Sequence, residues 1–483
     1  MAARIPISML TTSQQEKIIK DLHIVESNAK WGNKKTSLKA IDFYFRDQDE
    51  ILIPYNYACK FFERPHINLR RKFYQVQPWT FKEGFQLREY QKEVLQIADK
   101  HYKDRGCVFF NVFCAFGKTV VGSYKAMQFS QSSNLLTLIT YPRSILRDSW
   151  LGTLQNLANV KVYVVDLDNV QIPDDTQIIL CMNTRIKKIP KEILSRVGHL
   201  IVDEADLYCT QGNVEGLLSI EPLFITLMTA TYERDDGMHI MLDLLGGSER
   251  ITRISTKPFF VFHYPTPFTP ENVVTTSWGV QYDSIVAELD AIEERNLLIA
   301  NLVIVNLDQK IMVLTYHVKH AEYLASCLST LIAPYGKTVA LLAGSVKEYF
   351  DSDVLVGTQK KIGIGFDEKE VAIGWKGRRI NLLILASIGL KIEQIAGRVF
   401  RAETPVIIDL VDNYRNNKNH YSVRKKWYES RNGHITTIRD LNSAIWSMNG
   451  PALMEKCKSS PVSDRLVEDC HADSVVNRFL HNL

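Results

Sequence analysis

The stretch "VFFNVFCAFGKTVVGSYKAM", residues 108–127, passes from an apolar run to a helical pattern through Gly117-Lys118-Thr119. Such a turn binds a nucleotide phosphate because backbone N–H groups and a helix N-terminus point at the anion, and the lysine adds positive charge. The hydroxyl of Thr119 is expected to reach magnesium. Val112 and Ala115 stand where glycines are usual, and the methyl group of Ala115 would narrow the loop if that position needs a positive φ. Taken alone, the tripeptide fits a nucleotide site and an ordinary strand and helix equally well.

The composition indicates a globular protein. A chain of 483 residues, 46% hydrophobic and 23% charged, is long enough for two or three domains. Its formal net charge of +4 permits local basic grooves but does not by itself indicate a nucleic-acid-binding protein. We find no apolar run of about 18 residues and no secretory signal. We therefore expect no signal peptide, no transmembrane segment and no membrane partner.

The eight cysteines are scattered, and none forms a C-x-x-C pair. A zinc site needs clustered ligands, and a disulfide framework is typical of short secreted chains. We therefore expect reduced cysteines and no zinc. Cys470-His471 is the only adjacent Cys/His pair, and an ordinary exposed tail is the favoured interpretation.

From residue 85 onward, short apolar runs alternate with segments of helical spacing such as "REYQKEVLQIADKHYKD" at 88–104. Continuous runs rich in β-branched and aromatic residues are typical of parallel strands buried on both faces. The alternation predicts α/β domains with doubly wound parallel sheets. The predicted strands lie within 106–113, 135–142, 160–167, 176–183, 198–206, 222–231, 309–317, 337–344, 353–359, 380–387 and 404–412.

Four prolines between Lys257 and Glu271 interrupt this series and indicate a linker. Two α/β domains of similar size then stand in tandem. The predicted divisions are an N-terminal accessory region and candidate DNA-binding region at 1–84, a first domain at 85–256, a linker at 257–272, a second domain at 273–420 and a C-terminal extension at 421–483.

A pair of acids adds to the nucleotide interpretation. "HLIVDEADLY" places Asp203 and Glu204 where an apolar run ends. The carboxyl ends of strands are where open α/β sheets bind ligands. One carboxylate can hold magnesium while its neighbour orients and deprotonates an attacking water. A solvated acidic strand end is the alternative, but the acids combined with the loop favour a nucleotide site.

These motifs resemble those of the superfamily two helicases. Asp203-Glu204-Ala205-Asp206 is the "DEAD" signature, and Thr229-Ala230-Thr231 is similar to the third motif, whose threonines couple hydrolysis to movement. The form "TATYERDDG" resembles that of excision-repair and phage recombination helicases. Tyr232 replaces the usual proline, a departure that we expect to loosen the turn without removing the coupling threonines. "FQLREYQKEVL" is similar to the element in which a glutamine, here Gln91 beside Arg88, reads adenine.

Further motifs follow in the family's order. "LITYPRSILRDSW" resembles motif Ia, which implies DNA-backbone contacts from Pro142 and Arg143. "KIMVLTYHVKHAEYLASCL" resembles motif IV. "DVLVGTQKKIGIGFDEKE" resembles motif V, in which Thr358 would touch backbone and Asp367 the ribose. "IEQIAGRVFRAE" matches the sixth motif with Gln394, Gly397, Arg398 and Arg401.

The resemblance implies two tandem RecA-like domains, ATP and Mg²⁺ as cofactors, and DNA as a partner. It assigns catalysis to Lys118, Asp203, Glu204, Gln394, Arg398 and Arg401, and ATP binding to Arg88, Gln91, Ala115, Phe116, Gly117, Lys118, Thr119 and Asp367. Thr119 and Asp203 would hold the metal. The arginines of the second domain would stabilise the transferring phosphoryl group. A solvated helix face is the alternative for Gln394, Arg398 and Arg401.

Within the superfamily, the set of motifs resembles the poxvirus transcript-release DNA helicases. That resemblance implies a DNA-dependent ATPase that unwinds 3′-to-5′ and releases nascent RNA from a viral RNA polymerase elongation complex with its transcription factors. Virion packaging and action in the host cytoplasm would follow. A repair or recombination helicase is one alternative. An ATP-switched binding module without turnover is another, and the complete set of catalytic side chains argues against it.

Two segments interleave basic and aromatic residues, at 66–75 and 423–431. Such segments favour nucleic-acid contact, because basic side chains neutralise phosphates and aromatic faces stack on unpaired bases. The alternative is that Phe73, Trp427 and Tyr428 belong to the core. The core alternative is slightly favoured for the first segment and less so for the second.

Overall fold

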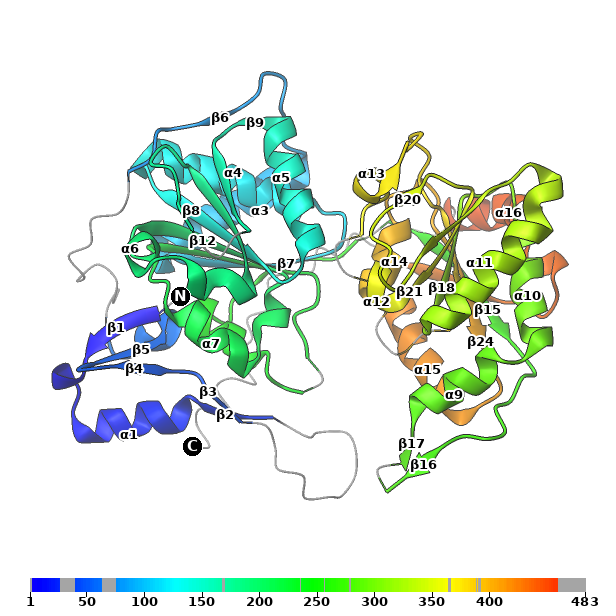
Figure 1. The fold of residues 1–483 in the computed structure, drawn as a ribbon, viewed down its shortest axis with the longest axis horizontal. Helices are drawn as coiled ribbons and strands as arrows, with labels where there is room; N and C mark the ends of the chain where they lie inside the picture. Colours follow the sequence, from blue (N-terminus) through cyan, green and yellow to red (C-terminus); the bar gives the residue numbers. More distant parts are fainter. Residues whose placement is uncertain are drawn as a thin grey trace. The chain divides into compact units, whose positions relative to one another are not determined.

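The computed structural model describes residues 2–26, 40–62, 75–166, 170–234, 236–255, 257–277, 279–363, 366–387, 389 and 392–458. These residues form two compact units (Figure 1). Unit 1 contains the described residues up to Arg253, and unit 2 begins at Ile254. The predicted segment 66–75 falls almost entirely outside the described residues, and so does Cys470-His471.

Unit 1 is built on a parallel sheet of seven strands in the order β10-β11-β8-β12-β13-β7-β14. Neighbouring side chains point to opposite faces, so Phe109 packs in one core cluster and Phe110 in the other. Both faces are therefore covered, which explains the continuous apolar runs. The strands are β7 Cys107–Val112, β8 Leu136–Tyr141, β10 Val162–Val165, β11 Ile178–Met182, β12 Val197–Asp203, β13 Phe224–Thr229 and β14 Ile251–Arg253.

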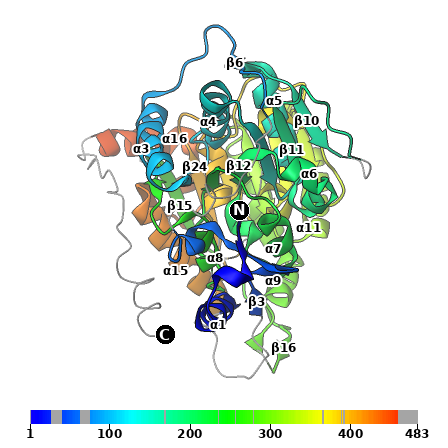
Figure 2. The same cartoon turned by 90° about the vertical axis from the view of Figure 1, so that its left-hand side faces the viewer.

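Helices cover the two faces of this sheet. Val94, Val121 and Trp150 from α3, α4 and α5 pack in the Phe110 cluster, while Val214 and Met241 from α7 and α8 pack in the Phe109 cluster. Figure 2 shows the N-terminal elements on the side of α7 and α8. The helices are α3 Glu89–Arg105, α4 Lys118–Ser133, α5 Ser144–Leu157, α6 Lys191–Leu194, α7 Gln211–Leu218 and α8 Ile240–Gly246; β6 Thr80–Phe81 pairs with β9 Ala158–Asn159.

The N-terminal residues, expected to form a separate accessory region, share the core of unit 1. A small antiparallel sheet, β1-β5-β4, packs its apolar side chains into the Phe109 cluster. The amide of Ala2 donates to Ile220 O at 3.0 Å, and Arg4 Nε pairs with Glu221 at 3.1 Å. These elements are β1 Ala2–Pro6, α1 Thr12–Asp21, β2 His23–Val25, β3 Ala40–Asp42, β4 Phe45–Asp47, β5 Glu50–Pro54 and α2 Tyr55–Ala58.

Unit 2 repeats the plan with a second seven-stranded parallel sheet, in the order β19-β21-β18-β23-β24-β15-β25. The predicted fold class, two tandem α/β domains with parallel sheets, is confirmed. The strands are β15 Phe259–Pro265, β18 Ile311–Thr315, β19 Val339–Leu342, β21 Val354–Thr358, β23 Leu382–Leu385, β24 Val406–Val411 and β25 Gly433–Thr437, with the short pairs β16 Thr275–Thr276 and β17 Gly279–Val280, and β20 Tyr349–Phe350 and β22 Ala372–Ile373.

Two strands of this sheet correct the predicted divisions. Strand β15 lies inside the predicted linker at 257–272, and β25 lies inside the predicted C-terminal extension. The prolines were misleading because Pro258 precedes β15 and Pro265 ends it, so the strand between them stays unbroken. The apolar "FFVFHY" within β15 pairs with β24 on one side and β25 on the other.

The basic-aromatic segment at 423–431 belongs mostly to helix α15. Tyr428 is fully buried and donates its hydroxyl to Asp409 Oδ2 at 2.8 Å, while Arg424 pairs with the same carboxylate at 2.8 and 2.9 Å. The core alternative is therefore correct for Tyr428. The helices of unit 2 are α9 Tyr282–Asp290, α10 Glu293–Ile304, α11 Val318–Ile332, α12 Gln359–Ile362, α13 Glu368–Val371, α14 Glu393–Val399, α15 Arg415–Ser430 and α16 Trp446–Lys458.

Within the described ranges, no helix combines the length and the hydropathy needed to cross a bilayer.

The Arg424–Asp409 pair generates a stability prediction. Arg424→Ala leaves a fully buried carboxylate without its cation, which costs about 3–5 kcal/mol in the free energy of unfolding. Urea denaturation followed by tryptophan fluorescence measures this loss. Lys425→Ala is the matched control, because the Lys425 side chain is 50% exposed and its loss should change stability by less than about 0.5 kcal/mol. Equal small losses in both variants would contradict a buried role for Arg424.

Candidate active site

The loop between β7 and α4 adopts a left-handed turn at two positions. The backbone φ angle is 74° at Ala115 and 92° at Gly117. A Cβ atom at Gly117 would stand 2.5 Å from Gln91 Nε2, so glycine is required there by both conformation and space. Ala115 carries its methyl group in the same region of φ, at a cost of about 1–2 kcal/mol. The backbone at Ala115 therefore has the positive φ on which the expected narrowing of the loop depends.

Helix α3 is joined to this loop through Gln91. Its side chain is 4% exposed, donates from Nε2 to Phe116 O at 3.0 Å and accepts at Oε1 from the Arg88 backbone N–H at 3.0 Å. The ring of Tyr90 lies 5.0 Å from that of Phe116. Arg88, Gln91, Phe116 and Gly117 are thus brought together as predicted from their motifs, with the Gln91 amide engaged by the loop itself.

Lys118 and Glu204 meet at the carboxyl edge of the sheet. Lys118 Nζ lies 3.4 Å from Glu204 Oε1, and the two side chains are 13% and 10% exposed. Burial lowers the pKa of Lys118, but the charges of Glu204 and of the neighbouring acidic groups together outweigh it, so the pKa of Lys118 is raised and the ammonium stays charged. The other oxygen, Glu204 Oε2, is buried without a hydrogen-bond partner among the described residues.

Asp203 ends β12 beside this pair. Its Oδ2 accepts from Trp150 Nε1 at 2.9 Å, and its Oδ1 accepts from the Glu204 N–H at 3.0 Å. Burial and then the charge of Glu204 raise the pKa of Asp203 to about 6. Glu204 itself has a φ of 48°, a left-handed conformation that turns the chain sharply after the strand. The turn gives the two adjacent carboxylates different directions.

These groups fit magnesium. Mg²⁺ is held in proteins by one or two carboxylates together with substrate phosphates and waters. Asp203, the orphaned oxygen of Glu204 and the Thr119 hydroxyl offer the hard oxygen ligands that this ion prefers. Within the described ranges, no three His, Cys, Asp or Glu side chains form a metal-binding group by themselves.

Asp206 joins the acidic motif to the third motif. Thr229 donates to Asp206 Oδ1 at 2.6 Å, and Thr231 donates to Asp206 Oδ2 at 3.2 Å. Arg234 Nη1 donates to Asp206 O at 2.6 Å. The two threonines expected to act in coupling are therefore bonded to the residue that ends the DEAD signature.

Tyr232, which replaces the family's proline, fastens the following loop to helix α8. Its hydroxyl donates to Asp243 Oδ2 at 2.6 Å. The Arg250 guanidinium lies 3.7 Å from the centre of the Tyr232 ring and pairs with Asp243 at 3.1 Å. This tyrosine was expected to loosen the turn, whereas in the structure its hydroxyl and its ring each make a contact that holds it. Asp243 and Arg250 carried no signal in the sequence.

The motif Ia residues Pro142 and Arg143 follow β8, whose carboxyl end lies next to that of β12. Both are half-buried, and Arg143 immediately precedes α5. They therefore share the edge of the sheet that carries Lys118 and Asp203, because parallel strands end on one side.

In unit 2, motifs V and VI are joined by ion pairs and hydrogen bonds. Asp367 accepts from Arg379 at 2.7 Å and pairs with Arg401 at 3.0 Å. Burial raises the pKa of Asp367, but Arg401 and Arg379 outweigh it and lower that pKa. Thr358 ends β21 and is 3% exposed. Arg379 was not among the residues expected in this site.

Arg398 is 7% exposed and donates to Phe366 O and Gly363 O, each at 2.9 Å. The solvated-face alternative is therefore wrong for Arg398, whose guanidinium holds the motif V loop. Arg401 also donates to Phe366 O, at 3.3 Å, and Gln394 lies half-buried on the same helix, α14.

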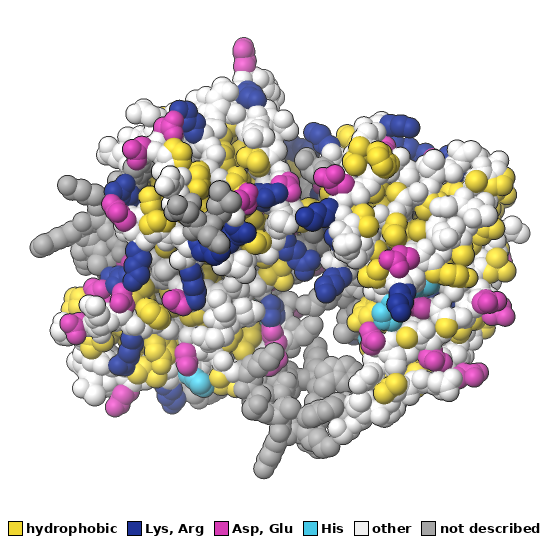
Figure 3. Space-filling model, in the orientation of Figure 1, with side chains coloured by type: hydrophobic (Ala, Val, Ile, Leu, Met, Phe, Trp, Pro, Cys, Tyr) yellow, Lys and Arg dark blue, Asp and Glu magenta, His cyan; other side chains and the backbone are white. Residues whose placement is uncertain are grey.

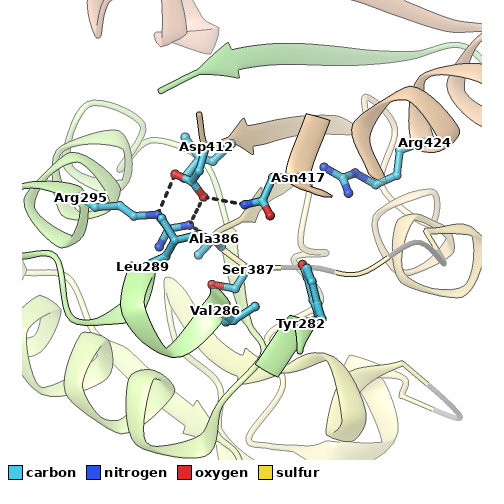
Figure 4. Close-up of a pocket in the computed structure, with 10 residues that line it drawn as sticks. Tyr282, Val286, Leu289, Arg295, Ala386, Ser387, Asp412, Asn417 and Arg424 are labelled. Atoms are coloured by element: carbon cyan, nitrogen blue, oxygen red, sulfur yellow. Dashed lines mark hydrogen bonds and ion pairs between the residues drawn. The ribbon is translucent and has the colours of Figure 1, made fainter. Parts of the chain in front are cut away.

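A small polar pocket lies elsewhere in unit 2, at the carboxyl ends of β23 and β24 (Figure 4). Arg295 pairs with Asp412 at 2.9 and 3.0 Å, and Asn417 donates to the same carboxylate at 3.4 Å. Arg424, which also lines the pocket, pairs with Asp409 at 2.8 Å. Because the charged side chains of the pocket are paired with other side chains, they are typical of a structural network.

The strain at Ala115 generates a prediction. Ala115→Gly removes the left-handed penalty but makes the unfolded chain more flexible, so the free energy of unfolding should rise by about 0.5–1 kcal/mol. Chemical denaturation measures the difference. Ala126→Gly, a buried position in helix α4, is the control and should lose about 1 kcal/mol. A loss of stability in both variants would contradict the backbone conformation at Ala115.

Known proteins were compared with the chain, and no family model matches it. It is 27% identical over 419 residues to "Putative helicase 161L" of Invertebrate iridescent virus 6, covering 80% of this chain and 89% of that protein. It is 28% identical over 349 residues to "Putative helicase 055L" of Frog virus 3, covering 71% and 77%. A variant of S. cerevisiae Dbp5 bound to RNA and ADP BeF3 aligns over 76% of this chain and 92% of that one, with a TM-score of 0.50 and 15% identity.

The structural likeness supports the fold, two tandem RecA-like domains. The two viral relatives are similar in sequence to this chain over most of its length. Taken with the ordered motifs of the sequence, these findings support an ATP-hydrolysing enzyme that is similar to the superfamily two helicases.

Proposed function

We propose that the chain is a DNA-dependent ATPase that moves 3′-to-5′ along DNA and separates strands. The observation that carries this proposal is the arrangement of Lys118, Asp203 and Glu204 at the carboxyl edge of unit 1, with one carboxylate oxygen left without a protein partner. Phosphoryl transfer to water needs a phosphate, a metal ion and a base close together. The arrangement of these three side chains supports that reaction.

Each side chain has a distinct role in this proposal. Lys118 and the N–H groups at the start of α4 bind the phosphates of ATP. Thr119 and Asp203 would hold Mg²⁺, which when bound neutralises charge on the phosphates. Glu204 orients the attacking water and accepts its proton. The resemblance assigns Arg88, Gln91 and Asp367 to the nucleoside, and Gln394, Arg398 and Arg401 to the phosphoryl group.

The contacts of Asp206 support a route from hydrolysis to movement. Asp206 is two residues from Glu204 and holds both Thr229 and Thr231. A change in the acidic motif on ATP turnover therefore reaches the loop after β13 directly. Pro142, Arg143 and Thr358 are the residues that we assign to the nucleic-acid backbone.

The biological role that we propose rests on the resemblance, and the viral origin of the relatives supports a viral role. We infer that the enzyme acts in viral transcription, in the virion and the host cytoplasm, and releases nascent RNA from a stalled polymerase elongation complex with its transcription factors. Its test is ATP-dependent release of labelled RNA from such a complex. Activity on branched DNA without any release would favour the repair or recombination alternative.

The nucleotide site and the polarity are tested together by strand separation. The wild-type chain should separate a duplex with a 3′ single-stranded tail when ATP is present. Lys118→Ala should lose at least about 10²-fold in ATP hydrolysis, because it removes the charge opposite the phosphates. Lys92→Ala, whose side chain is 50% exposed, is the matched control and should keep full activity. Normal turnover by Lys118→Ala would refute the phosphate site, and separation of only 5′-tailed duplexes would refute the polarity.

Arg401 should matter mostly in the transition state. Arg401→Ala should lower the rate of ATP hydrolysis by about 10³-fold, while the Kd for a non-hydrolysable ATP analogue changes by less than about threefold. Arg415→Ala, an exposed arginine in the same unit, should leave both quantities unchanged. Equal losses in binding and in hydrolysis would show that Arg401 only binds the nucleotide.

A further inference from the structure

A short two-stranded ladder in unit 2 has apolar side chains that are exposed to solvent instead of packing in the core. Strands β20 and β22 are parallel, with Tyr349 opposite Ala372 and Phe350 opposite Ile373. Tyr349 and Ala372 are buried, at 4% and 8% exposure, whereas Phe350 is 74% and Ile373 44% exposed. The inner pair meets the packing needs of the ladder. The outer pair places an aromatic ring and an aliphatic side chain in water with no internal partner to explain it.

Asp351, the residue after β20, anchors the ladder to the rest of unit 2. The Asp351 N–H donates to Ile373 O at 3.0 Å, and Asp351 Oδ2 accepts from the Lys376 N–H at 2.9 Å. Asp351 also forms an ion pair with Lys310, and the two side chains are 6% and 4% exposed. A buried ion pair that also ties both strands gives Phe350 a fixed platform. Binding would therefore lose little conformational entropy there.

Basic side chains flank this apolar pair. Lys347 lies three residues before Phe350, and Lys376 lies three residues after Ile373; both are exposed. Arg378 is exposed as well, and Glu348 is the one acid between Lys347 and Phe350. Figure 3 shows hydrophobic side chains beside Lys and Arg over the part of unit 2 that Figure 1 labels α13 and β20. The surface carries more basic than acidic side chains, which suits a polyanion, and the exposed ring of Phe350 lies between them in the sequence.

The ladder is also linked to the motifs of unit 2. The Arg379 guanidinium lies 4.7 Å from the centre of the Trp375 ring, in the turn that follows β22. The same guanidinium donates to Asp367, which pairs with Arg401. Arg379 therefore connects Trp375, beside the ladder, with the Asp367–Arg401 ion pair that joins motifs V and VI.

We propose that this surface, residues 346–350 and 372–379, binds single-stranded nucleic acid, with Phe350 stacking on an unpaired base and Lys347 and Lys376 contacting phosphates. The inference rests on the proposed function and adds a site to it. Unpaired strands fit because an exposed aromatic ring stacks only on a base that is free of its duplex, and the flanking cations follow the backbone. An acidic protein partner would need no aromatic face.

The test is direct binding of the full chain to a fluorescein-labelled oligothymidylate, followed by anisotropy. Phe350→Ala should weaken binding about tenfold, since losing one stacked base typically costs that much. Phe350→Trp should restore wild-type affinity, and Tyr335→Ala, 61% exposed in the same unit, should not change it. The double variant Lys347→Gln/Lys376→Gln should lower the slope of log affinity against log salt by about 1.4.

The same variants separate this inference from the proposed function. If the wild-type chain hydrolyses ATP faster with DNA, and Phe350→Ala binds the oligonucleotide with unchanged affinity, the surface is not a nucleic-acid site although the proposed function stands. If DNA leaves the hydrolysis rate unchanged, the proposed function fails, while a Phe350-dependent loss of binding still establishes the site.

Discussion

Parallel strands end on one edge of their sheet, and the active site of unit 1 depends on that constraint. Lys118 follows β7, Asp203 ends β12 and Thr229 ends β13, three strands that lie side by side. Lys118 and Glu204 are 86 residues apart in the chain and yet form an ion pair. The left-handed turns at Gly117 and Glu204 then aim these side chains, so chemistry distant in sequence converges without a long loop.

Much of this arrangement could be predicted, because it follows from local patterns. The predicted strands of both sheets coincide with observed strands, since continuous apolar runs buried on two faces have few other structures available. The loop, the acid pair and the threonines lie at one edge of the sheet for the same reason, because each follows or ends a strand.

The predictions that were wrong concern residues whose structure depends on tertiary contacts. The prolines around β15 hid a strand whose neighbours, β24 and β25, lie more than a hundred residues away in the chain. Tyr232 looked like a weakened turn because its partners Asp243 and Arg250 have no motif. The segment with Arg424 and Tyr428 left a nucleic-acid surface and a core position both open, and the buried hydrogen bonds of these two residues to Asp409 place them in the core. A basic-aromatic pattern does not tell a buried charge network from an exposed one.

The most direct test of the account is the rate of ATP hydrolysis by the purified chain without nucleic acid and with single-stranded DNA, duplex DNA or RNA. Glu204→Gln serves as the blank, because it keeps the shape of the side chain and removes the base. We predict strong stimulation by DNA over RNA that is absent from the blank. No hydrolysis under any of these conditions, or equal rates in the blank, would contradict a DNA-driven ATPase centred on Lys118 and Glu204.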